Sequence, residues 1–185
     1  MVTANGPAPG SAVTEARGGY YPGPGDRAHP GPASVRLSRE IRDGIVRHAR
    51  AELPNEACGL IVGDSPAPEG GEALRWIPLR NALASPFRYE IDPTDLLRLT
   101  IETERANEAI WAIVHSHVAS AARPSPTDVR QSFYPEALYG LVSLDPAEAD
   151  SVTGAENVRA WRILDGTVHE IALVIDEPAP AGLRA

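Results

Sequence analysis

Hydrophobic positions along the chain fall into short apolar runs and amphipathic stretches, which together predict strands that alternate with helices. Short apolar runs and alternating patterns predict strands at 57–63, 74–79, 87–91, 110–115, 139–144, 158–164 and 167–174. The last two strands are joined by Asp165 and Gly166, and this dipeptide is a strong signal for a two-residue hairpin turn.

Helices are predicted where a capping residue precedes an amphipathic stretch. Ser38 is a good N-cap for a helix that runs to about residue 51. Asp92 followed by proline predicts the start of a second helix, and Ser125 followed by proline predicts a short third helix. Strands and helices in this order indicate a single α+β domain with one core.

The two ends of the chain differ from the middle in composition. Residues 1–34 are rich in Gly and Pro and have no apolar periodicity, so we expect a disordered N-terminal tail. Residues 176–185 are expected to form a flexible C-terminal tail. The folded domain is therefore predicted to span residues 35–175.

Charge and cysteine content exclude several classes of function. The formal net charge of −8 argues against nucleic acid as a partner, because phosphate contacts need a basic surface. Cys58 is the single cysteine, so no intramolecular disulfide can form. No apolar run approaches the ~18 residues of a membrane span, and no secretory signal is recognisable. We therefore expect a cytoplasmic protein without a membrane partner; the oligomeric state is left open, with a homodimer as one alternative.

The segment HSHVASAARPSPTD, residues 115–128, carries the most informative chemistry. His115 and His117 lie two positions apart on a predicted strand, so they face the same side, roughly 7 Å apart along the chain. Asp128 lies in the first turn of the helix that follows. Two imidazoles and one carboxylate suit Zn²⁺ and leave a fourth position for water, which is typical of a catalytic site. An isolated pair of histidines is often only structural, but Ser125, Asp128 and the upstream Glu56 favour a metal site.

These residues resemble the JAMM (MPN+) metalloprotease family. Its motif, H-x-H-x(7)-S-x-x-D, is matched at every defined position, and LPNEACGLIVG is similar to the segment in which the family places a glutamate before a Cys-Gly-Leu strand. The similarity continues through FRYEIDPTDLLRL, YGLVSL and WRILDG and so covers about residues 35–175. The resemblance implies a single domain of the MPN (cytidine-deaminase-like) fold, with a mixed sheet flanked by helices.

The resemblance also implies a role for each matched residue. His115, His117 and Asp128 correspond to the ligands of one zinc ion per chain. Glu56 corresponds to the general acid/base that moves a proton from the attacking water to the leaving amine. Ser125 corresponds to the serine that stabilises the developing oxyanion. Zinc lowers the pKa of bound water towards ~7, and a nearby carboxylate is then a natural proton shuttle.

Several of these residues have a simpler interpretation. Glu56 could be a solvated loop carboxylate, and Ser125 could serve only as a helix N-cap. Cys58 could be a reactive thiol or a further ligand, but a buried small residue is the favoured interpretation because it lies in an apolar run. Val118 replaces the proline that commonly follows the second histidine in bacterial relatives, which puts only the shape of the loop in doubt.

JAMM enzymes hydrolyse peptide or isopeptide bonds after the C-terminal tail of ubiquitin-like proteins. The compact chain between Glu56 and His115 resembles the bacterial branch, above all the Mec-type hydrolases that release cysteine from a ubiquitin-like sulfur-carrier protein in cysteine biosynthesis. Two alternatives stay open. One is a desampylase-like isopeptidase that removes a ubiquitin-like modifier from protein lysines. The other is a non-catalytic MPN scaffold, which is disfavoured because the three ligands and Glu56 are all present.

Overall fold

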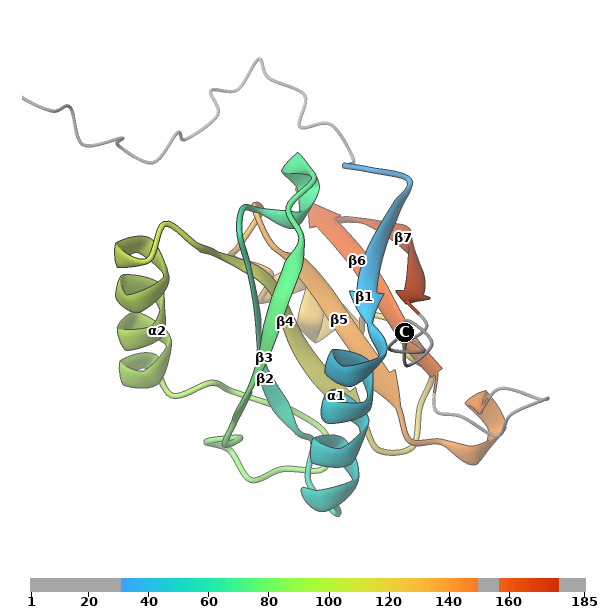
Figure 1. Ribbon diagram of the computed structural model, residues 1–185. Coiled ribbons are helices and arrows are strands. Elements are labelled where there is room, and N and C mark those ends of the chain that lie inside the picture. Colours follow the sequence, from blue (N-terminus) through green and yellow to red (C-terminus); the bar gives the residue numbers. More distant parts are fainter. Residues whose placement is uncertain (1–30, 150–156, 177–185) are drawn as a thin grey trace, which may run out of the picture.

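The computed structural model describes residues 31–149 and 157–176, which form one mixed sheet flanked by helices (Figure 1). The strands are β1 (Ser34–Ser38), β2 (Cys58–Gly63), β3 (Ala73–Leu79), β4 (Ala109–His117), β5 (Leu138–Ser143), β6 (Asn157–Leu164) and β7 (Thr167–Asp176). Their order across the sheet is β1-β7-β6-β5-β4-β2-β3. The β1–β7 and β4–β5 pairs are parallel and the other pairs are antiparallel.

Three α-helices and two short 3₁₀ helices connect the strands. They are α1 (Arg39–Ala51), α2 (Pro93–Arg105) and α3 (Pro126–Arg130), with 3₁₀ turns at Ala67–Glu69 and Pro146–Glu148. Each α-helix begins at the predicted cap. The Ser38 hydroxyl accepts from the backbone N–H three residues later at 3.2 Å, and the Asp92 carboxylate accepts from the N–H two residues later at 2.8 Å. Both contacts satisfy donors that a helix start leaves without partners.

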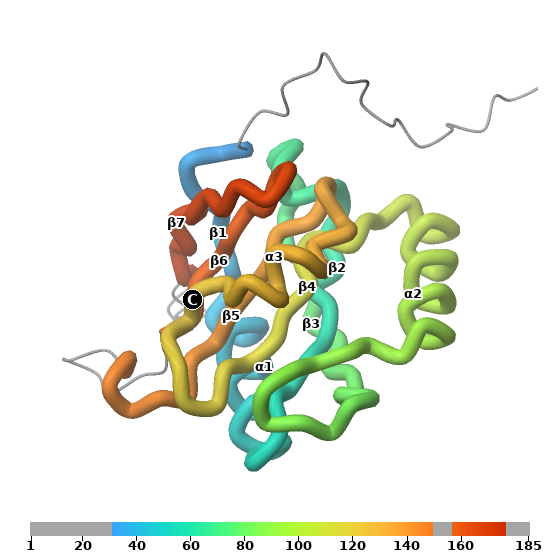
Figure 2. Tube along the Cα trace, turned by 180° about the vertical axis from the view of Figure 1, so that it is seen from behind, coloured from blue at the N-terminus to red at the C-terminus, as the bar shows by residue number. Residues whose placement is uncertain are grey.

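The core has two parts, one on each face of the sheet. On one face, α1 packs its apolar stripe against the strands (Figure 1). On the other face, seen in Figure 2, Leu99 of α2 and Val129 of α3 pack against the cluster that includes Ile113 and Leu141. β4 lies between β2 and β5, so residues at its C-terminal end have a strand on each side. On the face opposite α1, α3 and the loop before it cover the sheet.

Most predicted elements are confirmed, with two differences. The strand predicted at 87–91 is absent from the described structure, where only the bridge between Asn81 and Ile91 remains. The segment instead turns around the Asn81 side chain. This side chain donates to the Arg88 carbonyl and accepts from the Glu90 N–H, two backbone groups that would otherwise bond to a neighbouring strand. The second difference is β1, which the pattern did not predict because it is short and depends on parallel pairing with β7, far away in the sequence.

The hairpin and the chain ends complete the comparison. Asp165 and Gly166 both have positive φ angles, 48° and 77°, as the predicted two-residue turn requires. Most of the two predicted tails, residues 1–30 and 177–185, lies outside the described residues, whereas Ser34 already belongs to β1. Within the described ranges, every helix is too short or too polar to cross a membrane.

Candidate metal centre

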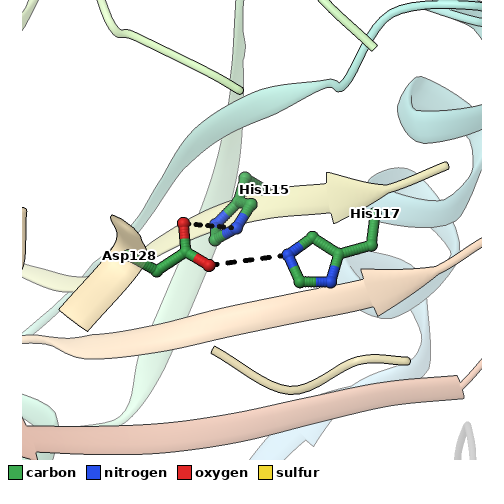
Figure 3. A group of neighbouring side chains, drawn as sticks. All are labelled: His115, His117 and Asp128. Atoms are coloured by element: carbon green, nitrogen blue, oxygen red, sulfur yellow. Dashed lines mark ion pairs between the residues drawn. The ribbon is translucent and has the colours of Figure 1, made fainter. Parts of the chain in front are cut away.

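The C-terminal end of β4 presents two histidines to the same face of the sheet (Figure 3). His115 and His117 are separated by one residue, so the two-residue period of a strand turns both imidazoles the same way. Their ring centroids lie 5.1 Å apart, and both side chains are buried. The strand thus brings the two histidine side chains together on one face.

Asp128 reaches the same point from the first turn of α3. Its position is fixed by a capping box, in which the Ser125 N–H donates to Asp128 Oδ2 at 2.6 Å and the Asp128 N–H donates to Ser125 Oγ at 3.3 Å. Asp128 Oδ1 lies 3.4 Å from His115 Nε2, and Oδ2 lies 3.6 Å from His117 Nε2 (Figure 3). Ligand atoms around a tetrahedral ion with ~2.0 Å bonds lie about 3.3 Å apart, so these spacings fit one metal ion.

The hydrogen bonds and pKa shifts of the three side chains bear differently on metal binding. Burial lowers the pKa of His117, but the Asp128 carboxylate outweighs burial and raises that pKa above its usual value, so a bound metal would replace a proton held by this pair. His117 Nδ1 lies 2.7 Å from the Ala121 carbonyl. Because a carbonyl can only accept a hydrogen bond, Nδ1 carries the proton, and Nε2 keeps its lone pair in the neutral ring. Burial lowers the pKa of His115, which favours its neutral form. Burial by itself raises the pKa of Asp128. The two imidazoles outweigh burial, and the pKa of Asp128 lies well below its usual range. Two imidazole nitrogens and a carboxylate thus form a donor set suited to a divalent cation.

Glu56 lies just before β2, next to the histidines. In the antiparallel pairing Cys58 is opposite His115, and the same register places Glu56 opposite His117. Ser116 secures this register beyond the strand end, because its hydroxyl accepts from the Ala57 N–H at 2.8 Å and its own N–H donates to the Ala57 carbonyl at 3.0 Å. The Glu56 side chain is only 6% exposed, and burial raises its pKa to about 7.

A cavity of about 420 Å³ connects these groups to the surface. Glu56, His117, Ser125 and Asp128 all line it. His115 lies deeper and is covered by the ring of Tyr89, which stacks on the imidazole with centroids 4.2 Å apart. The structure therefore brings four of the five predicted site residues to one cavity and places His115 behind them, 3.4 Å from Asp128 Oδ1.

Sequence comparison assigns the family. The sequence pattern of the prokaryotic homologs of the JAB domain matches residues 38–164, which include every residue of this site. The chain belongs to this family. It is 39% identical over 136 residues to the CysO-cysteine peptidase of Mycobacterium tuberculosis, a similarity that covers 72% of this chain and 86% of that protein.

Two further relatives place the JAB domain among known proteins. The desampylase of Haloferax volcanii is 33% identical over 116 residues, which cover 60% of this chain and 81% of that protein. The solution structure of a protein from Desulfitobacterium hafniense superposes with a TM-score of 0.64 at 28% identity, and covers 78% of this chain and 94% of that one. The MPN-type fold predicted from the sequence is thereby confirmed.

The loop between β4 and α3 of the JAB domain is held by side chains of the sheet. The carbonyls of residues 120–122 accept hydrogen bonds in turn from Ser143 Oγ at 2.7 Å, His117 Nδ1 at 2.7 Å and Trp161 Nε1 at 3.0 Å. These contacts fix the path that brings α3 back over β4. The loop therefore keeps a defined shape with Val118 in the place of proline.

Two residues that line or support the site were not singled out from the sequence. Asn81 is buried, and its side-chain amide donates to the Glu56 carbonyl at 3.0 Å. Tyr89 covers His115, as described above. Neither belongs to the H-x-H-x(7)-S-x-x-D motif. The local pattern around Tyr89 suggested a strand between 87 and 91. The lone asparagine between two apolar segments was the available signal for a buried hydrogen-bonding residue.

Cys58 has no part in the site. It is 1% exposed, and its thiol lies 3.7 Å from the Leu79 carbonyl. Burial raises the pKa of the thiol to about 12, so the reactive thiolate form is suppressed at neutral pH. Within the described residues, the cluster with metal-ligand spacing consists of His115, His117 and Asp128 without Cys58. The preferred interpretation of Cys58 as a buried small residue agrees with these contacts.

Proposed function

We propose that this JAB domain is a zinc peptidase that hydrolyses the bond after the C-terminal tail of a ubiquitin-like protein, and that it releases cysteine from a sulfur-carrier protein. The observation that supports the proposal is that two histidines and an aspartate with metal-ligand spacing lie beside a buried glutamate at one cavity. In this proposal His115, His117 and Asp128 hold one zinc ion per chain.

The donor set favours zinc over magnesium and calcium. Imidazole nitrogen is a poor ligand for magnesium and calcium, which prefer oxygen, whereas zinc accepts nitrogen and carboxylate oxygen in tetrahedral geometry. Three protein ligands leave one position open, as catalytic zinc sites do. When bound, zinc supplies a polarised carbonyl and a water of lowered pKa.

Glu56 is proposed to move the proton. A pKa of about 7 lets its carboxylate accept a proton from the attacking water and return it to the leaving amine at neutral pH. The water oxygen bonds to the carbonyl carbon, the C–N bond breaks, and the amine leaves with the proton from Glu56. Because Glu56 lies opposite His117 and lines the cavity, substrate can reach its carboxylate.

Ser125 is proposed to stabilise negative charge on the carbonyl oxygen. Its Oγ accepts from the Asp128 N–H, so the hydroxyl proton remains available for donation. Ser125 lines the cavity next to the metal ligands, and α3 holds it rigidly through the capping box. The serine therefore has two roles that do not compete, one as N-cap and one as oxyanion donor.

The substrate is proposed from the relatives. The CysO-cysteine peptidase and the desampylase are both named for ubiquitin-like conjugates, and the first has the higher identity over a larger share of this chain. We therefore propose a carrier protein with a C-terminal cysteine as substrate, and the peptide bond before that cysteine as the bond hydrolysed.

Intact-mass spectrometry of two substrates tests this proposal. The zinc-loaded protein is incubated with a carrier–cysteine adduct and, separately, with a modifier joined to a protein lysine. We expect the adduct to lose one cysteine residue, and we expect the Glu56→Gln variant to leave it intact. Release from the lysine conjugate alone would instead assign the isopeptidase activity. An intact adduct and an intact conjugate would refute a peptidase of either kind.

A further inference from the structure

The segment after β3, residues 81–90, forms one wall of the cavity and is held in shape by a buried side chain. The Asn81 amide nitrogen donates to the Glu56 carbonyl at 3.0 Å and to the Arg88 carbonyl at 2.9 Å. Its amide oxygen accepts from two backbone N–H groups of the same segment, at 3.0 and 3.2 Å. One buried side chain thus fixes the backbone of Arg88 relative to that of Glu56.

Arg88 is the one Lys or Arg side chain among the described residues that line this cavity. It is exposed, and within the described part of the chain its guanidinium makes no hydrogen bond or ion pair. Several arginines elsewhere pair with carboxylates, as in Arg36–Asp176, Arg75–Glu108, Arg98–Glu102 and Arg159–Glu170, whereas Arg88 differs from the other described arginines in lining the cavity. In a chain with net charge −8, an unpaired cation in the wall of a catalytic cavity is available to an anionic group of the substrate.

We propose that Arg88 binds the free α-carboxylate of the C-terminal residue that is released. The proposal rests on the proposed function, because only hydrolysis one residue from a chain end places a carboxylate beside the bond that is cut. Consecutive Cα atoms lie ~3.8 Å apart, so that carboxylate is one residue away from the scissile carbonyl. The planar guanidinium matches a carboxylate with two parallel hydrogen bonds.

The same contact distinguishes the two classes of substrate. A lysine side chain joined to a modifier through its ε-amine carries no carboxylate next to the scissile bond. Arg88 therefore favours a single C-terminal residue over an isopeptide conjugate. It acts on binding and leaves proton transfer to Glu56, so its removal affects recognition of one substrate group and spares the chemical step.

Two matched substrates test the contact. One is the carrier–cysteine adduct with its natural C-terminal carboxylate, and the other is the same adduct ending in a carboxamide. Cysteine or cysteinamide release is measured as kcat/KM for the zinc-loaded wild type and for Arg88→Gln. The control is Arg80→Gln, which changes an exposed arginine of the same region that does not line the cavity.

The wild type and Arg80→Gln are expected to prefer the carboxylate substrate by about 10- to 100-fold, the usual range for a charge-assisted hydrogen-bonded pair. Arg88→Gln is expected to lose this preference through a higher KM for the carboxylate substrate, with a much smaller loss of kcat/KM on the carboxamide. A preference retained in Arg88→Gln, an equal loss on both substrates, or no preference in the wild type would each overturn the proposed contact. Failure of the wild type to release anything from either substrate would refute the proposed peptidase itself, and the carboxylate site with it.

Discussion

Replacing Glu56 with glutamine changes how the stability of the metal-free protein depends on pH. The ordinary pKa of a glutamate side chain is 4.5, and burial raises that of Glu56 to about 7 in the folded protein. Above pH 4.5 the unfolded chain loses this proton while the folded protein keeps it. The free energy of unfolding of the wild type therefore falls as the pH rises, until Glu56 ionises in the folded state near pH 7 as well.

The size of the effect follows from the two pKa values. The difference between about 7 and 4.5, at ~1.36 kcal/mol for each pH unit, amounts to about 3 kcal/mol. About 2.5 kcal/mol of it falls between pH 5 and pH 8. The carboxylate lines the cavity and is partly solvated there, so about 2.5 kcal/mol is the upper end of the expected change. Glutamine has a similar shape and does not titrate, so the Glu56→Gln variant lacks this pH-dependent loss.

Urea unfolding of chelator-treated wild type and Glu56→Gln at pH 5 and pH 8 measures the effect. We expect the stability of the variant relative to the wild type to increase by about 1–2.5 kcal/mol between the two pH values. Any pH-independent cost of the substitution cancels in this comparison, as do the titrations of groups that do not interact with Glu56. His117 interacts with Glu56, so the measured change reports the coupled pair. Parallel pH profiles for the two proteins would refute the conclusion that Glu56 is buried with a near-neutral pKa.

Four further changes test other parts of the site. Asn81→Ala leaves buried backbone groups without partners and should lower the free energy of unfolding by about 3 kcal/mol in urea unfolding; a loss below ~1 kcal/mol would contradict its role. Ser125→Gly keeps most of the N-cap stability but removes the hydroxyl, so kcat should fall about 100-fold at an unchanged melting temperature, and full activity would exclude an oxyanion role. Tyr89→Ala should weaken zinc binding about 10-fold in a chelator competition, whereas Tyr89→Phe should not, because the ring supports His115. Equal zinc affinities of the wild type and both variants would refute this role of the ring. Zinc at 1,000 times its Kd should raise the free energy of unfolding of the wild type by about 4 kcal/mol, measured by thermal unfolding, and should hardly change that of Asp128→Ala. An equal gain in both proteins would place the metal elsewhere.

Local spacing makes the clustering of the candidate metal ligands predictable from the sequence. His115 and His117 share a face because they are two residues apart on a strand, and Asp128 follows from a capping motif within the same short segment. Glu56 could be placed only through the family resemblance, since the pairing of β2 with β4 brings it beside His117.

The contacts that shape the cavity depend on tertiary structure. Tyr89 lies far from His115 in the sequence, yet their rings stack, and Asn81 organises a segment whose apolar pattern suggested a strand. The pairing of β1 with β7 joins the two ends of the domain, and no local pattern encodes such a contact. Sequence periodicity therefore predicts the elements that carry the ligands, whereas the substrate-facing wall required the structure.

X-ray absorption at the zinc edge tests the central claim most directly, because it reports the ligands of the metal in the folded protein. For zinc-loaded wild type we predict one zinc ion per chain with nitrogen and oxygen neighbours at ~2.0–2.1 Å, outer-shell scattering from two imidazoles, and no sulfur neighbour. A sulfur neighbour at ~2.3 Å, which only Cys58 or Met1 could supply from within the chain, would contradict the assignment of His115, His117 and Asp128. Failure to retain zinc would contradict it as well.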